Sequence, residues 1–199
     1  KVFDVDALKL ETRTFGAELV GHAGEDGAVE VSQLAVTWPD LSAAPALAST
    51  VAGGALRARG SATVTDAWSK PAVDAKLSAE GIDLELVNAD ARRVLGPAPK
   101  LSATLRYARE VGLVADTVRF LTDALSVEGS GAVSTEGRVK ATADVGVPDV
   151  SILAAATPSP VAGAAVVAVA VDGTTDAFEA TATARSQGIR IRGAEPLTG

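Results

Sequence analysis

The chain has 199 residues, a formal net charge of −7 and no cysteine. Its length allows one or two compact domains, and the lack of cysteine excludes disulfides, thiolate catalysis and cysteine-based metal sites. Lysine and arginine form no run, so a nucleic-acid-binding face is disfavoured. Apolar residues make up 47% of the chain but aromatic residues only 4%. This composition favours a broad, thin sheet over a thick core.

Alternating apolar and polar residues predict β-strands along most of the chain. Residues 2–20 predict two strands joined by a turn near Phe15-Gly16. Gly24-Glu25-Asp26-Gly27 has the composition of a hairpin turn. In the next strand, residues 28–38, the apolar positions change from odd to even numbers, which predicts a bulge near Ser32-Gln33.

Two short helices are expected between the strands that follow. Asp40 or Ser42 is placed to cap a helix over residues 43–48 that ends at Gly53 and Gly54. Residues 88–96 predict a second capped helix, ended by Gly96-Pro97. The remaining strands are predicted at residues 55–65, 72–79, 82–87, 101–107, 112–120, 124–133, 139–147, 165–171, 178–184 and 189–191. Short turns such as 134–137 predict a continuous antiparallel meander with one wet and one dry face.

An internal repeat with a period near 110 residues organises the chain. Four landmarks recur in the same order, shifted by 109, 110, 110 and 107 positions. The first copies are Pro39-Asp40-Leu41-Ser42, Val51-Ala52-Gly53, Asp66-Ala67-Trp68 and Gly81-Ile82, and the second are Pro148-Asp149-Val150-Ser151, Val161-Ala162-Gly163, Asp176-Ala177-Phe178 and Gly188-Ile189. The predicted organisation is one continuous domain over residues 1–199, with approximate repeats at 39–147 and 148–199, the second incomplete.

Residues 150–171 form an uncharged stretch long enough to cross a membrane. Pro158, Pro160 and Gly163 interrupt it, and its period changes at Gly163. These features favour a buried strand preceded by a helical loop.

Few residues are candidates for catalysis. His22 is interpreted as a solvated loop histidine, since no Gly-x-Ser-x-Gly elbow supplies a nucleophile. Asp40 and Asp149 hold equivalent repeat positions and could be paired acids, but helix capping explains both. The Gly-x-Gly at 129–131 opens no helix, so it does not predict a nucleotide loop. The chain is therefore expected to be non-enzymatic and to need no cofactor or metal.

Two aromatic residues occupy equivalent places after an aspartate. Trp68 follows Asp66-Ala67, and Phe178 follows Asp176-Ala177. Such rings could stack on a sugar or a lipid head group. The favoured interpretation is that each ring is a packing plug for the turn beneath it, because burial is the commoner fate of an aromatic side chain.

The repeated landmarks, together with residues 89–105 and their Leu-Ser-Ala-Thr-Leu segment, resemble the TamB translocation and assembly subunits and the wider AsmA-like group of bacterial envelope proteins. The resemblance implies a long, half-rolled antiparallel sheet, taco-shaped in section, with an apolar concave face. It also implies a place in the periplasm of a Gram-negative bacterium, an inner-membrane anchor outside this segment, and an Omp85-type outer-membrane barrel as partner. Family members are implicated in phospholipid transport to the outer membrane and in outer-membrane protein assembly.

The residues support an apolar groove on separate grounds. Alanine and valine are too small to fill a sandwich of two sheets about 10 Å apart, so a half-open groove is the expected fold class of this all-β chain with a few short helices. Such a groove would gain about 0.8 kcal/mol per buried methylene of an acyl chain. The predicted function is a lipid conduit that binds phospholipid. The alternatives are a structural β-repeat scaffold, a chaperone for outer-membrane protein assembly, or an adhesin stalk.

The predicted lipid-contact residues are the larger apolar members of the dry strand faces. They are Val73, Leu77, Leu101, Leu105, Val139, Val145, Val167, Val169, Ile189 and Ile191.

Overall fold

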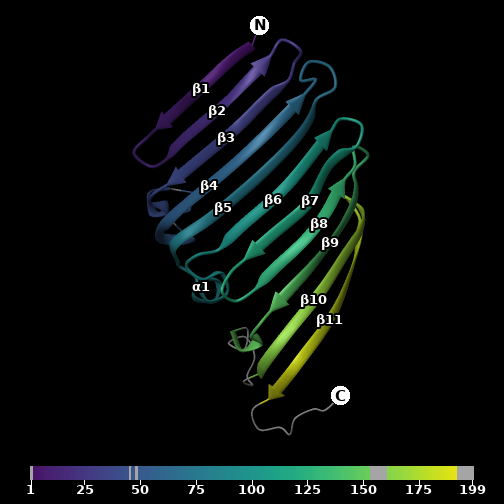
Figure 1. Cartoon of the computed structure of the whole chain (residues 1–199). Coiled ribbons are helices and arrows are strands. Elements are labelled where there is room, and N and C mark those ends of the chain that lie inside the picture. The colour runs from purple at the N-terminus through teal and green to yellow at the C-terminus, as the bar shows by residue number, and fades with distance from the viewer. Residues whose placement is uncertain (1, 45, 48, 153–160, 192–199) are drawn as a thin grey trace.

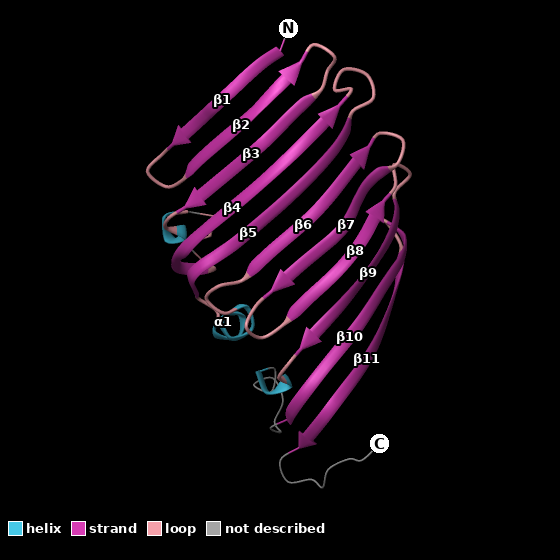
Figure 2. Ribbon diagram, viewed as in Figure 1, coloured by secondary structure: helices cyan, strands magenta, loops and turns pink. Residues whose placement is uncertain are grey.

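Eleven antiparallel strands form one sheet, with neighbours in sequence always neighbours in space (Figure 1). The computed structural model describes all residues except 1, 45, 48, 153–160 and 192–199. The strands are β1 Val2–Glu11, β2 Gly16–Gly24, β3 Val29–Trp38, β4 Val51–Thr65, β5 Ala72–Leu86, β6 Lys100–Ala108, β7 Gly112–Leu121, β8 Ser126–Val133, β9 Arg138–Val147, β10 Val161–Thr174 and β11 Phe178–Ile191. The predicted all-β meander with a few short helices is confirmed. The sheet is open and twisted, and it does not roll up over either face (Figure 2).

Tight turns join the strands where the sequence places flexible residues. In the predicted hairpin turn at 24–27, the Gly27 amide donates to the Gly24 carbonyl at 3.2 Å. At 134–137, the Gly137 amide donates to the Ser134 carbonyl at 2.9 Å. Both closing glycines have left-handed φ angles, 80° at Gly27 and 77° at Gly137, which a glycine adopts at little cost. Both predicted turns are confirmed.

Bulges keep the apolar side chains on one side of the sheet. The predicted bulge at Ser32-Gln33 is confirmed, because the register shifts between Val31 and Leu34 of β3. Further shifts lie between Val5 and Leu8 of β1 and in β7 after Ala115. An extra residue reverses the odd–even phase of a strand, so the apolar residues after each bulge return to the same face.

Three short helical segments lie at strand ends on the same side of the sheet (Figure 2). They are the 3-10 turns η1 Leu41–Ala43 and η2 Val150–Ile152 and the helix α1 Ala89–Leu95. We call this row of strand ends the helical edge, as distinct from the edge strands β1 and β11. Asn88 caps α1 through its side-chain oxygen, which accepts from the Asp90 and Ala91 amides. Gly96 follows α1 with a φ of 63°, as the predicted helix end requires.

The predicted helix over residues 43–48 is wrong in the described part of that range. The 3-10 turn ends at Ala43, and Ala44 is extended with a ψ of 110°. Ala44 precedes a proline in the sequence, and the proline ring disfavours the helical conformation in the residue before it. Residues 45 and 48 lie outside the described residues. Gly53 and Gly54 do not end a helix, because both lie within strand β4.

The repeated landmarks occupy matching places in the fold. η1 precedes the long hairpin β4–β5, and η2 precedes the long hairpin β10–β11, six strands later. Each long hairpin has an irregularity near its open end. Gly54, with a φ of 104°, lies against Asp83, whose φ is 49°, and Gly163, with a φ of 130°, lies against Gly188, whose φ is 63°.

The uncharged stretch at 150–171 is partly described. Residues 161–171 lie in strand β10 and residues 150–152 in η2, whereas 153–160 lie outside the described residues. No helix within the described residues is long and apolar enough to span a membrane.

The core is small and lies at the helical edge of the sheet. Leu41 of η1, Val51 of β4 and Leu86 of β5 are buried, and the partly buried residues packed against them are Trp38, Leu47, Leu56, Leu84, Ala91 and Leu95. The accessible surface is 13290 Å², whereas a compact domain of 19.9 kDa exposes about 8,700 Å². Most of the sheet is therefore a single layer with both faces uncovered.

Candidate functional site

The strand register sorts the side chains of the sheet onto two faces of opposite character. Residues directly opposite each other in paired strands point to the same side. Four rows of apolar residues and glycine cross all eleven strands without interruption. The central row consists of Leu8, Leu19, Leu34, Gly60, Leu77, Ala103, Val118, Gly129, Ala143, Val169 and Ala182. We call the side that carries these rows the apolar face.

The other rows of the apolar face lie on both sides of the central one. They begin in β1 at Phe3, Val5 and Leu10 and end in β11 at Phe178, Ala180 and Ala184. Tyr107 is the one member with a hydroxyl group. With strands about 4.8 Å apart, a row that crosses eleven strands is roughly 48 Å long.

Eight of the ten predicted lipid-contact residues lie together on the apolar face. Leu77 and Val169 belong to the central row, and Leu105 belongs to the row that starts at Val5. Leu101, Val145 and Val167 share the row that starts at Leu10, and Val73 and Val139 share the row that starts at Phe3. Ile189 and Ile191 lie in β11, but their side chains are outside the described part of the chain.

Sequence reasoning predicted strand β1 but missed its place on the apolar face. Phe3 is 67% exposed and Leu8 is 63% exposed. The bulge between Val5 and Leu8 hides this pattern, since Phe3 and Val5 are odd-numbered while Leu8 and Leu10 are even-numbered. A test for apolar alternation that allowed one phase change would have placed the apolar residues of this strand on one face.

A hollow of about 200 Å³ lies on the apolar face near its centre. Its apolar lining comes from strands β3 to β6, and consists of Leu34, Val36, Ala58, Leu77, Ala79 and Leu101. The small residues of β4 and β5 leave space between the larger side chains on either side. The helical edge closes one end of this face, because Trp38 and Leu56 pack there against η1 and the other residues of the core.

The opposite side of the sheet, which we call the polar face, carries charged residues in opposed pairs. Across strands β6 and β7, the Arg106 Nε donates to the Asp116 Oδ2 at 2.6 Å, and Nη2 donates to Oδ1 at 2.5 Å. This hydrogen bonding lowers the pKa of Asp116 and raises that of Arg106. Arg119 Nη2 likewise donates to Glu128 Oε1 at 2.8 Å, which raises the pKa of Arg119.

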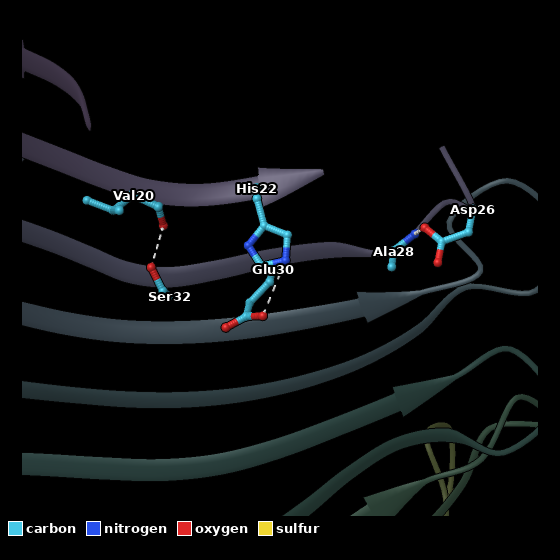
Figure 3. A network of polar contacts seen from close by, with 6 residues as sticks. All are labelled: Val20, His22, Asp26, Ala28, Glu30 and Ser32. Atoms are coloured by element: carbon cyan, nitrogen blue, oxygen red, sulfur yellow. Dashed lines mark hydrogen bonds and ion pairs between the residues drawn. The ribbon is translucent and has the colours of Figure 1, made fainter. Parts of the chain in front are cut away.

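His22 lies on the polar face in strand β2, so its predicted place in a loop is wrong. Its Nε2 is 3.5 Å from Glu30 Oε2 on the neighbouring strand, as Figure 3 shows. The imidazole is about half exposed, with a side-chain exposure of 48%. The nearby Ser32 hydroxyl donates to the Val20 carbonyl at 3.3 Å, across the β3 bulge. No hydroxyl or thiol nucleophile contacts His22 within the described residues.

Asp40 and Asp149 cap the two 3-10 turns, as predicted for helix caps. Asp40 Oδ1 accepts from the Ser42 amide at 2.9 Å and from the Ser42 hydroxyl at 2.6 Å, which lowers the pKa of Asp40. Asp149 Oδ1 accepts from the Ser151 amide at 2.9 Å, and this bond lowers the pKa of Asp149. The two carboxylates lie at separate strand ends, so they do not form one site.

The expected burial of Trp68 and Phe178 is wrong. Trp68 is 81% exposed and lies over Gly27 in the neighbouring turn, where the Ala67 amide also donates to the Gly27 carbonyl at 3.0 Å. Phe178 is 65% exposed at the end of its row on the apolar face. A single-layer sheet has no second layer under which these rings could be buried.

The candidate site is therefore a continuous apolar surface. It has a hollow near its centre and is covered at the helical edge, and a charged face lies on its other side. Comparisons with protein-family models, curated proteins and solved structures found no match for the chain.

Proposed function

We propose that this chain is a non-enzymatic lipid-conduit module that binds phospholipid acyl chains along its apolar face. The observation that carries the proposal is the set of four uninterrupted apolar rows across eleven strands. An apolar surface of this extent on a water-soluble module needs a partner, because uncovered apolar area is unfavourable in water.

Hydrocarbon is a suitable partner for physical reasons. The rows present methyl and methylene groups and almost no hydrogen-bonding side chain, so they favour a ligand without polar groups to satisfy. Each methylene removed from water contributes about 0.8 kcal/mol regardless of its direction. Attraction of this kind lets an acyl chain shift from one row position to the next without crossing a large energy barrier, which suits transport.

The cellular setting in this proposal comes from the resemblance to the TamB and AsmA-like proteins. On that basis the module works in the periplasm of a Gram-negative bacterium, between an inner-membrane anchor outside this segment and an Omp85-type outer-membrane barrel. The lipid it carries is phospholipid moving toward the outer membrane.

A second candidate is a scaffold or chaperone for the strands of outer-membrane proteins. The observation in its favour is that β1 and β11 each pair with only one strand among the described residues. An edge strand presents free backbone donors and acceptors, and an added strand can pair with them. In this candidate the apolar face would cover the apolar side of the incoming strands instead of lipid.

A charge on the apolar face tests the lipid proposal. Val145 lies in a row between Val127 and Val167, and Val145→Asp would place a carboxylate among them. Because a buried charge near hydrocarbon is costly, we expect lipid passage to stop and the phospholipid recovered with the purified protein to fall several-fold. Bound lipid is measured by extraction and mass spectrometry, and circular dichroism checks that the sheet is intact.

Thr142→Asp is the matched control for this experiment. Thr142 lies on the same strand, β9, but its neighbours Ser130 and Ala170 belong to the polar face. This variant should carry as much lipid as the unmodified protein. Full lipid recovery with Val145→Asp, or equal loss in both variants, would overturn the proposal.

A further inference from the structure

A second hollow lies on the polar face and is larger than the one on the apolar face. It has a volume of about 600 Å³ and spans strands β4 to β8. Four basic side chains line it, those of Arg57, Arg59, Lys100 and Arg119. We call this hollow with its four cations the basic basin.

The strand register fixes how the basin is built. Arg59 of β4 and Arg119 of β7 stand in one row, separated by Ser78 of β5 and Ser102 of β6. The two serines are short, so they form the floor of a gap about 14 Å wide between the two arginine backbones. The hydroxyl groups of this floor can donate hydrogen bonds to a ligand that lies in the gap.

Arg57 and Lys100 belong to the neighbouring row, on either side of Glu80. The basin thus has cations along two rows and on three strands. A ligand centred over the two serines lies within reach of long, flexible side chains from both rows.

The charge of the basin is opposite in sign to that of the whole chain. Four cations and the two acidic residues Glu80 and Glu128 line the hollow, so its formal charge is +2, whereas the chain carries −7. Arg119 pairs with Glu128 at 2.8 Å. Arg57, Arg59 and Lys100 have no ion pair among the described residues. Elsewhere on this face, cations such as Arg106 are matched by a cross-strand carboxylate.

We propose that the basic basin binds an anion that carries at least two phosphate groups. Guanidinium groups bind phosphate oxygens through paired hydrogen bonds, and three of the four cations are arginines. The gap between Arg59 and Arg119 is wider than one phosphate needs, which favours a ligand with two or more anionic groups. Paired phosphates of this kind occur in soluble oligophosphates and in the head groups of membrane lipids with two phosphates, such as cardiolipin.

The basin is a separate site from the proposed lipid-binding surface. The two lie on opposite faces of a single-layer sheet, so a lipid whose acyl chains cover the apolar face cannot place its head group in the basin. Loss of anion binding would therefore leave the lipid-conduit proposal standing, and the reverse also holds.

Calorimetric titration with sodium pyrophosphate at constant ionic strength tests the soluble form of the ligand. Vesicles of cardiolipin, whose head group carries two phosphates, in phosphatidylcholine test the head-group form by comparison with pure phosphatidylcholine. Arg59→Gln removes one guanidinium of the basin, and Lys140→Gln removes a cation from the polar face of β9, outside the basin. We expect Arg59→Gln to weaken binding about tenfold, as the loss of one charge-assisted contact does, and Lys140→Gln to leave it within about twofold.

Each outcome decides the matter. Binding of pyrophosphate that depends on Arg59 supports a soluble ligand, and binding of cardiolipin vesicles that depends on Arg59 supports a lipid head group. Equal weakening by Arg59→Gln and Lys140→Gln would show diffuse charge attraction and overturn the basin as a site. Binding to neither probe would overturn it as well.

Discussion

At the scale of the residue, the two faces of the sheet differ because successive side chains of each strand point to opposite sides. Adjacent residues of β6 show this, since Leu105 lies on the apolar face while Arg106 lies on the polar face and pairs with Asp116 of β7. The apolar side chains contribute through the area they cover, without preferred direction. The polar side chains contribute through cross-strand pairs, which require the correct register.

The Arg106–Asp116 pair predicts a specific pH dependence of stability. The pKa of Asp116 is lowered in the folded protein because Arg106 donates two hydrogen bonds to its carboxylate. Because the pKa of Asp116 is lower in the folded protein, the pair stabilises the fold at pH values above the ordinary aspartate pKa of 3.8. This stabilisation is lost as the pH falls through the folded pKa of Asp116. Asp116→Asn should therefore lower the free energy of unfolding at pH 7, and the deficit should shrink below about pH 4.

A double-mutant cycle with Arg106→Gln isolates this pair from the other carboxylates. Urea unfolding of the single and double variants gives the coupling between the two side chains at each pH. The coupling should be present at pH 7 and absent in strong acid. A coupling that does not change with pH would show that the pair is held by contacts other than its charges.

Sequence reasoning was right for residues whose role is local and wrong for those whose role depends on the layers of the fold. Asp40 and Asp149 were predicted as caps, because a cap depends only on the next two or three residues. Trp68 and Phe178 were predicted to be buried, which would require a layer of structure that the sheet lacks. His22 was predicted in a loop, but it lies in a strand and pairs with Glu30 of the neighbouring strand, because pairing follows the register.

At the scale of the element, bulges and tight turns determine whether each strand fits the sheet. The long strands β4 and β10 each contain an irregularity near the start, and each includes a glycine in the left-handed region, Gly54 with a φ of 104° and Gly163 with a φ of 130°. These glycines lie close to the backbone of the paired strand, at Asp83 and Gly188 respectively. The same irregularity therefore occurs at equivalent positions of the two sequence repeats.

Gly54→Ala should be destabilising. A Cβ at this position would lie 2.6 Å from the Asp83 carbonyl oxygen, and L-residues rarely adopt its φ angle. We expect a loss of about 1–3 kcal/mol in the free energy of unfolding, measured by urea denaturation.

Gly16→Ala is the control at the start of β2. A Cβ at Gly16 meets no atom within 4 Å, so this variant should be neutral or slightly stabilising. Equal stability of the two variants would contradict the role assigned to the glycine of β4.

The elements themselves could largely be predicted from the sequence. Period-2 alternation located the strands, and turns at 24–27 and 134–137 followed from their residue types. The predicted helix over residues 43–48 is wrong because the proline after Ala44 disfavours a helix there, although the capping residues before it favour one. The bulges in β1 and β7 escaped detection because a phase change looks like loss of pattern unless one extra residue is allowed.

At the scale of the whole molecule, the protein is a sheet with a core only along its helical edge. Its exposed surface of 13290 Å² is about half as large again as that of a compact domain of the same mass. Sequence composition indicated such a thin sheet, because small apolar residues cannot fill a sandwich. An open sheet was expected, but the extent of its curvature could not be predicted, since curvature depends on bulges and twist accumulated over all eleven strands.

The central claim is that hydrocarbon covers the apolar face, and crosslinking from two adjacent positions of β10 tests it most directly. Val169 lies on the apolar face and Ala170 on the polar face, so the two positions differ mainly in the side to which they point. A photoreactive amino acid is introduced at each position in cells, and the adducts are identified by mass spectrometry. We expect phospholipid adducts from position 169 and none above background from position 170. Equal lipid adducts from both positions, or no lipid adduct from position 169, would contradict the account.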